Sequence, residues 1–284
     1  MMRGAFLRLR KAAGFTLVEM IVVIVLTGIV AGMVAVFIRS PVQAYVDTAN
    51  RARLTEAADT AMRFFARDLR SALPNSLRVT TVGTTSYLEF IPTVGGGRYR
   101  QYPTNGGGGD VLDFSVADGA FDVIGPVPVY DNTHSVVVFN TDTALGSTTN
   151  AYVGNNRATV TTANNNAAAI STDAARHTVT IAATRFPAPS PSQRFHMVGT
   201  PVTYVCNPTA GVLQRYSGYA FAQNQTTPPA GAPNVLVNNV TACTIAYNPA
   251  VNTMRTGVVL ISLTLTLNNE NVNLVHQVHV QNMP

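Results

Sequence analysis

One carboxylate at the edge of a long apolar run is the residue of this chain that most clearly suggests chemistry. Glu19 is the last residue of the segment Gly14-Phe15-Thr16-Leu17-Val18-Glu19. The nineteen residues that follow it, 20–38, carry no charge. A carboxylate inside hydrocarbon is costly, so its presence there indicates a function. The first fourteen residues form a leader that contains no acid and is basic at four positions, which are Arg3, Arg8, Arg10 and Lys11.

The apolar run has the length of a membrane-spanning helix. Residues 15–38 would form a helix about 36 Å long, against a bilayer core of about 30 Å. The basic leader predicts that the N-terminus stays cytoplasmic and that the bulk of the chain lies outside. A plain signal anchor and a secretory signal peptide are the alternatives. The run is longer than the apolar core of a signal peptide, and residues 31–37 offer no clean Ala-x-Ala cleavage site.

The segment 14–19 and its basic leader together resemble the type IV prepilin signature. The resemblance implies that a prepilin peptidase cuts after Gly14 and methylates the new N-terminus, Phe15. The freed amine would lie about one helical turn from Glu19, where opposite charges attract strongly although desolvation offsets much of the gain. In that family this carboxylate registers an incoming subunit against its neighbour, and the matching motif assigns that role to Glu19.

Two glycines interrupt the apolar run at Gly28 and Gly32. Small residues four apart permit close approach of helices in a membrane, and glycine also weakens a helix by roughly 1 kcal/mol relative to alanine. Pilin helices commonly loosen in this region when they pack in a filament. The alternative is that Gly28 and Gly32 are ordinary glycines of a membrane helix with no role in filament packing.

The rest of the chain offers no catalytic, metal or phosphate constellation that we recognise. The glycine run at 106–109 lacks the Lys-Ser/Thr of a phosphate-binding loop, and no Gly-x-Ser-x-Gly elbow occurs. His276 and His279 would lie on opposite faces of a strand, and two cysteines without neighbouring ligands do not make a zinc site. Four acids near glycines do not have the spacing of an EF-hand calcium loop; these are Asp110, Asp113, Asp118 and Asp122. We therefore expect no enzyme and no cofactor.

Charge gives little support for nucleic-acid binding. The leader holds four of the 19 basic side chains, so the remaining 15 nearly balance the 14 acidic ones. Nucleic-acid binding requires basic residues clustered on the folded domain. We therefore predict no nucleic-acid partner.

The two cysteines, Cys206 and Cys243, are predicted to form a disulfide, because an extracytoplasmic compartment is oxidising. Closing a loop of that size contributes on the order of 3–4 kcal/mol in the chain-entropy model. Two buried free thiols are the alternative.

The sequence after the apolar run first continues as a helix. Ser40-Pro41 predicts a kink or short break, and residues 45–73 then show helical periodicity, stopped by Pro74. Asp59 and Arg63 are spaced as an i,i+4 ion pair on the polar face. The apolar stripe consists of Leu54, Ala58, Met62, Phe65 and Leu69.

Beyond Pro74 the pattern changes to short strands bounded by turn residues. The predicted strands are 86–92, 111–116, 135–140, 178–182, 201–206 and 212–216, followed by a C-terminal hairpin around the turn 268–271. Residues 95–97 and 106–109 are predicted loops, 223–233 is a Pro/Ala loop, and 141–173 is an irregular lobe or surface insertion. The predicted fold class is therefore α+β. A transmembrane half-helix (15–38) continues into an amphipathic half-helix (39–73), and the amphipathic half packs on an antiparallel β domain (74–284). This domain has one lobe or two.

Downstream segments narrow the resemblance. Residues 201–206 and 211–216 resemble the larger minor pilins and pseudopilins. Residues 39–45, 66–75 and 275–284 together are similar to the MshO-type minor pilins of the mannose-sensitive haemagglutinin (MSHA) pilus. This implies a single-pass inner-membrane protein with a periplasmic C-terminal domain, which enters a pilus to initiate or cap assembly and supports surface attachment. Its partners would be the prepilin peptidase, other major and minor pilins, and the pilus assembly platform. A type II secretion pseudopilin and a tip-exposed adhesive module are the alternatives.

Overall fold

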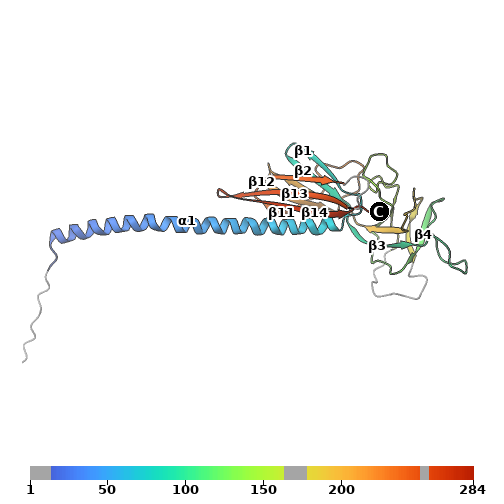
Figure 1. Ribbon diagram of the computed structural model, residues 1–284, viewed down its shortest axis with the longest axis horizontal. Coiled ribbons are helices and arrows are strands. Elements are labelled where there is room, and N and C mark those ends of the chain that lie inside the picture. Colours follow the sequence, from blue (N-terminus) through green and yellow to red (C-terminus); the bar gives the residue numbers. More distant parts are fainter. Residues whose placement is uncertain (1–13, 163–177, 250–255) are drawn as a thin grey trace, which may run out of the picture. The chain divides into compact units, whose positions relative to one another are not determined.

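A computed structural model of the chain describes residues 14–162, 178–249 and 256–284; the predicted basic leader lies outside these ranges. Helix α1 (Leu17–Arg70) is 54 residues long and runs through Pro41 without a break (Figure 1). The predicted break is therefore wrong. Proline removes only one backbone donor, and the turns on either side keep their own hydrogen bonds. Residues up to Asn50 form one unit, and residues from Arg51 onward form another.

Helix α1 ends at Arg70, three residues before the predicted end, because the backbone that follows joins a sheet edge. The Leu73 amide donates to the Ile91 carbonyl at 2.7 Å, and the Thr93 amide donates to the Ser71 carbonyl at 2.7 Å. These bonds satisfy backbone groups that a further helical turn would otherwise use.

The strands of the described residues form three antiparallel sheets. The first has the order β1-β2-β9-β10-β11 and the second the order β12-β13-β14; the third has the order β6-β5-β8-β3-β4-β7. The α+β prediction is confirmed. The strand bounds are β1 (Arg78–Val82), β2 (Thr85–Phe90), β3 (Thr93–Tyr99), β4 (Asp118–Ile124), β5 (Ser135–Val138), β6 (Arg157–Thr159), β7 (Thr178–Thr184), β8 (Arg194–Val198), β9 (Val202–Asn207), β10 (Val212–Ser217), β11 (Asn234–Asn238), β12 (Val240–Asn248), β13 (Thr256–Leu267) and β14 (Glu270–Gln281).

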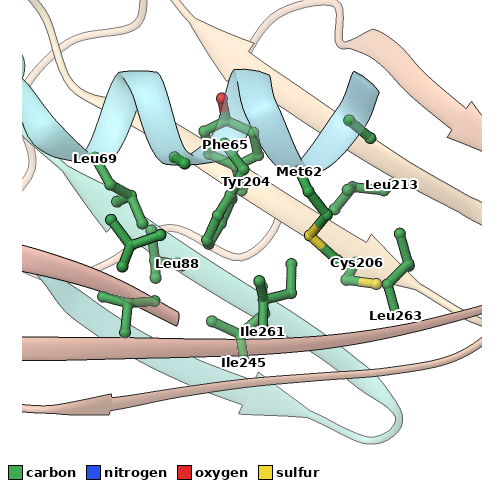
Figure 2. Packing of buried hydrophobic residues seen from close by; sticks show 14 of the residues in the cluster. Met62, Phe65, Leu69, Leu88, Tyr204, Cys206, Leu213, Ile245, Ile261 and Leu263 are labelled. Carbon is green, nitrogen blue, oxygen red and sulfur yellow. The ribbon is translucent and has the colours of Figure 1, made fainter. Parts of the chain in front are cut away.

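The predicted apolar stripe of the helix forms the main core with the first two sheets (Figure 2). Every member of the stripe is buried, and Phe65 packs edge-on against Tyr204 with ring centroids 5.0 Å apart. Cys206 in β9 and Cys243 in β12 are joined by a disulfide, which links the five-stranded sheet to the three-stranded one. The helix is thus fixed to strands that are far from it in sequence.

A second apolar core packs against the six-stranded sheet and includes Tyr99, Phe121 and Phe195. A smaller cluster that includes Leu73, Ile91 and Val198 lies at the junction of the helix end with strands of the first and third sheets. The β region therefore has two lobes with separate apolar centres, although residues from Arg51 onward cluster as one unit.

The C-terminal hairpin is confirmed, and its turn is shorter than predicted. Leu267 pairs with Glu270, so Asn268 and Asn269 alone form the turn, with φ of 51° and 70°. Positive φ at both central residues is the geometry of a two-residue hairpin turn, which asparagine tolerates. The alternating residues Ile261, Leu263 and Leu265 are fully buried.

The predicted strand 111–116 is wrong. The Asp113 carboxylate accepts hydrogen bonds from the Ser115 amide at 2.7 Å and from the Ser115 hydroxyl at 2.6 Å. The Asp113 amide in turn donates to the Asp118 carboxylate at 2.8 Å. Such local side-chain bonds make an Asx turn and remove the backbone from strand pairing. The other predicted strands correspond to β2, β5, β7, β9 and β10.

The predicted loop at Gly95, Gly96 and Gly97 is also wrong, because these residues lie inside β3. A Cβ on Gly97 would lie 2.9 Å from the Phe195 ring, and a Cβ on Gly96 would lie 2.9 Å from the Phe195 carbonyl oxygen. Gly96 and Gly97 are therefore required by close packing against β8, and a Cβ on Gly95 would lie 2.7 Å from the Pro128 side chain. The run 106–109 does lie in turns.

The described part of the predicted insertion, residues 141–162, is well packed; it is irregular as far as Asn156 and then includes the short strand β6. Asn150 and Asn156 are buried, and the Asn140 amide donates to the Pro74 carbonyl at 2.7 Å. The Ala151 amide donates to the Asn140 side-chain oxygen at 2.8 Å. Side-chain amides thus replace a sheet ladder before β6, which itself pairs with β5; residues 163–173 lie outside the described ranges.

Candidate processing and assembly site

The predicted cleavage position lies just outside the helix. Gly14 and Phe15 precede the first helical residue, Leu17, and the Phe15 side chain is 79% exposed. The Glu19 amide donates to the Thr16 hydroxyl at 3.2 Å, so Thr16 is the N-cap of α1. A peptide bond that is exposed and lies outside a helix can enter a protease active site, whereas a helical segment must first unwind.

Glu19 occupies the third position of α1, one turn from Phe15. Within the part of the chain that the structure describes, its carboxylate has no hydrogen-bond or ion-pair partner. Three residues of helix from the N-cap Thr16 correspond to a rise of about 4.5 Å, and one residue before it adds at most about 3.8 Å, so an amine at Phe15 would lie within reach of this carboxylate in the same chain or a neighbouring one. An acid in the first turn is also favoured by the helix dipole.

The surface of α1 after Glu19 is apolar and uncovered. Its residues from Leu17 to Ile38 are exposed, and among the described residues this helix alone is long and apolar enough to cross a membrane. The Thr27 hydroxyl donates to the Val23 carbonyl at 2.7 Å, so this polar group needs no external partner. A Cβ added at Gly28 or Gly32 would meet no neighbouring atom, so packing within the chain does not explain either glycine.

Asp68 holds the C-terminal part of the helix to the first sheet. Its carboxylate accepts from the Tyr204 hydroxyl at 2.9 Å and from the Arg215 guanidinium at 2.7 Å. Burial, followed by the nearby Asp68 charge, raises the pKa of Tyr204, so the phenol stays protonated and donates. On the opposite face, Asp59 and Arg63 form the predicted ion pair at 2.8 Å.

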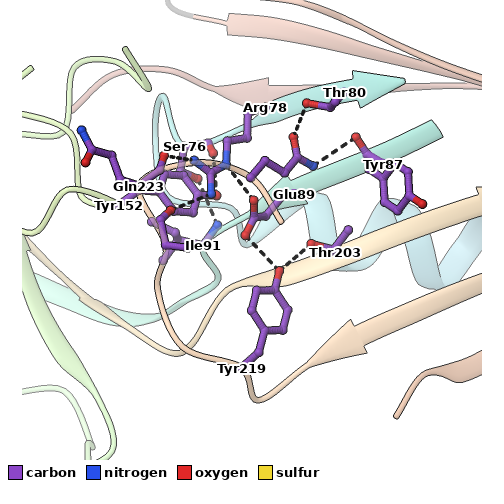
Figure 3. Close-up of polar contacts among 12 residues, drawn as sticks. Ser76, Arg78, Thr80, Tyr87, Glu89, Ile91, Tyr152, Thr203, Tyr219 and Gln223 are labelled. Atoms are coloured by element: carbon purple, nitrogen blue, oxygen red, sulfur yellow. Dashed lines mark hydrogen bonds and ion pairs between the residues drawn. The ribbon is translucent and has the colours of Figure 1, made fainter. Parts of the chain in front are cut away.

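A buried polar network, absent from the predictions, joins β1 and β2 to two loops (Figure 3). The Glu89 carboxylate accepts from the Arg78 guanidinium at 2.7 Å and from the Tyr219 hydroxyl at 3.0 Å. The Arg78 guanidinium lies 3.7 Å from the centre of the Tyr152 ring, whose hydroxyl donates to the Ser76 carbonyl at 3.0 Å. The sequence contains one indication of this network, which is the presence of Glu89 in the predicted strand 86–92, whose other residues are mostly apolar.

The structure also places the other titratable residues that the sequence analysis considered. Within the described residues, no group of three or more His, Cys, Asp and Glu side chains has metal-binding geometry. Asp122 accepts from the Asp110 amide at 3.0 Å and pairs with Arg100 at 3.3 Å, which is a structural role. His276 lies on the partly buried face of β14 and His279 on its exposed face, as the period-two pattern predicted.

Comparison with known proteins agrees with the N-terminal geometry. Residues 9–35 match the family model described as the prokaryotic N-terminal methylation motif, which supports a pilin-type protein. No curated protein and no solved structure matches the chain. The matched segment contains the exposed Gly14–Phe15 junction, Glu19 and the uncovered apolar surface.

Proposed function

Because the chain carries a pilin-type N-terminal methylation motif, we propose that it is a minor pilin of a type IV, MSHA-like pilus. Prepilin peptidase removes the leader after Gly14 and methylates Phe15. Before assembly, the mature chain is anchored in the inner membrane with its β domain in the periplasm. The chain then enters the base or tip of a filament through α1, where it initiates or caps assembly and supports surface attachment. It has no catalytic role.

The uncovered surface of α1 is the observation that carries this proposal. Residues 17–38 expose a continuous apolar surface, which a membrane covers before assembly and neighbouring pilin helices cover afterwards. The unpartnered Glu19 carboxylate would be neutralised by the N-terminal amine of an adjacent subunit. Gly28 and Gly32, where an added Cβ would meet no atom of the described residues, would allow neighbouring helices to approach closely.

The first experiment is mass spectrometry with N-terminal sequencing of the membrane-extracted protein, from cells with and without the prepilin peptidase. We expect a mature start at N-methylated Phe15 that depends on the peptidase. An intact Met1 start, or cleavage beyond Ala31, would remove the basis for the proposal.

The assembly role of Glu19 is tested with Glu19→Ala, using Thr27→Ala as the matched control in the same helix. We expect Glu19→Ala to reduce incorporation into sheared filaments at least about tenfold, the effect of losing roughly 1.4 kcal/mol of subunit attraction. Thr27→Ala should assemble normally, because that hydroxyl is satisfied within the helix. Equal incorporation of the two variants would contradict the mechanism.

A type II secretion pseudopilin is the second candidate, because the N-terminal motif is the same in both systems. The readout that separates them is the phenotype of a deletion strain. Loss of pili with normal exoprotein export supports the pilus, whereas loss of export with normal pili supports the pseudopilus. A third candidate, the tip-exposed adhesive module, predicts loop deletions in the six-stranded lobe that keep piliation and abolish attachment.

A further inference from the structure

An open pocket of about 500 Å³ lies in the six-stranded lobe, where the ends of β6 and β7 meet the loop before β4. Its volume is in the range of small-ligand sites. The residues that line it include two arginines, two threonines, an asparagine and two phenylalanines; these are Arg157, Arg185, Thr148, Thr184, Asn155, Phe114 and Phe186.

Arg157 is fixed in place before any ligand arrives. Its Nε donates to the Ala151 carbonyl at 3.0 Å, and its guanidinium carbon lies 3.6 Å from the centre of the Phe221 ring. A guanidinium has five N–H donors, so several remain for a ligand. Gly154, at φ 101°, brings the pocket wall close to this group, since a Cβ there would lie 3.4 Å from an Arg157 terminal nitrogen.

The charge of Arg157 is not neutralised by any carboxylate within 4 Å in the part of the chain that the structure describes. Burial without a paired acid lowers the pKa of Arg157. A half-buried cation without a counter-ion is costly, and a bound anion removes that cost. The pocket therefore favours a negatively charged group beside Arg157.

Arg185 adds a second positive charge at the exposed rim. Its Nε donates to the Phe114 carbonyl at 3.3 Å, which leaves its terminal nitrogens available. Asp113 interacts electrostatically with Arg185, but that carboxylate is exposed and already accepts two hydrogen bonds from Ser115. It neutralises Arg185 only in part, because charges in water are screened.

We propose that this pocket binds an anionic saccharide, with a carboxylate or sulfate between Arg157 and Arg185 and the sugar hydroxyls on Thr148, Asn155 and Thr184. A guanidinium recognises either anion through paired hydrogen bonds. The pocket is larger than an inorganic ion requires and is open to solvent, so one residue of a longer polysaccharide can enter it. This binding activity goes beyond the filament-subunit proposal and does not depend on assembly.

The test uses the purified full-length chain in nonionic detergent, titrated calorimetrically with three probes at constant salt. The probes are oligogalacturonate, which carries carboxylates, dextran sulfate, which carries sulfates, and neutral dextran. We expect saturable binding of at least one anionic probe and none of neutral dextran. Binding of oligogalacturonate alone assigns a carboxylate, and binding of dextran sulfate alone assigns a sulfate.

Three variants separate this site from general attraction to basic surfaces. Arg185→Gln should weaken binding about tenfold, as expected for losing a charge-assisted contact, and Arg157→Gln should weaken it further. Arg98→Gln is the matched control, because Arg98 is also exposed and its Nε donates to a backbone carbonyl, that of Ser192, at 3.2 Å. Arg185→Gln keeps the test valid if Arg157→Gln fails to fold.

The expected pattern is a loss for Arg185→Gln and an unchanged affinity for Arg98→Gln. Equal losses in these two variants, or no saturable binding of either anionic probe, would overturn the proposal. Because this binding is measured on unassembled protein, it can fail while the filament role holds, or hold while the filament role fails.

Discussion

Replacing Glu89 with glutamine should destabilise the β region far more than breaking an ion pair at the surface. Glu89 is 1% exposed, and its carboxylate lies 2.7 Å from the guanidinium of Arg78, whose side chain is 11% exposed. In Glu89→Gln the shape is kept and the charge is lost, so the largely buried Arg78 is left without a counter-ion. Removing one partner of a buried pair costs about 3–5 kcal/mol.

The low end of that range applies here, because Arg78 keeps other partners. Its terminal nitrogens donate to the Gln223 carbonyl at 2.7 Å and to the Ala222 carbonyl at 2.9 Å, and the Tyr152 ring covers one face. We therefore expect a loss of about 3 kcal/mol in the free energy of unfolding. For a domain of this size, that lowers the thermal midpoint by about 6–12 °C.

The assay is thermal and urea unfolding of the full-length chain in nonionic detergent, followed by near-UV circular dichroism of the ten tyrosines, since the chain has no tryptophan. Asp59→Asn is the matched control, because it breaks the Asp59–Arg63 pair, whose side chains are 49% and 77% exposed. That variant should lose at most about 0.5 kcal/mol. The reasoning would be refuted if Glu89→Gln and Asp59→Asn differed by less than about 1 kcal/mol.

Three further perturbations test other parts of the fold. Replacing both Cys206 and Cys243 with serine should lower the free energy of unfolding by about 3–4 kcal/mol for a sequence separation of 37, and a urea midpoint equal to that of the oxidised wild type would contradict this. Gly97→Ala should cost about 1–3 kcal/mol because its Cβ would lie 2.9 Å from an aromatic ring in β8, whereas Gly28→Ala should leave the β-domain melting midpoint unchanged. Burial, followed by the nearby Arg194 charge, lowers the pKa of His196 to about 4 from 6.5, so the contribution of His196 to stability is fully present above pH 6.5 and is lost as pH falls toward 4; His196→Gln should flatten this part of the wild-type profile of thermal midpoint against pH.

The sequence alone was sufficient for features that depend on local periodicity and on hydrocarbon burial. The apolar run after Glu19 predicted a helix whose surface the rest of the chain leaves uncovered, and Leu54 to Leu69 predicted the buried stripe. The alternation from Ile261 onward predicted the last hairpin. In each case one strong pattern, repeated over several turns or residue pairs, fixes both the element and its buried face.

Tertiary structure decided the features that depend on neighbours distant in sequence. Gly97 lies in a strand because β3 pairs with β8, and it must be glycine because the Phe195 ring leaves no room for a side chain. The helix ends at Arg70 because the following backbone pairs with residues near Ile91. The Arg78–Glu89 pair and the Arg157–Arg185 pocket likewise join groups from separate elements. No local pattern predicts such contacts, because a buried charge or a close backbone approach is stabilising only when the folded chain places the partner residue beside it.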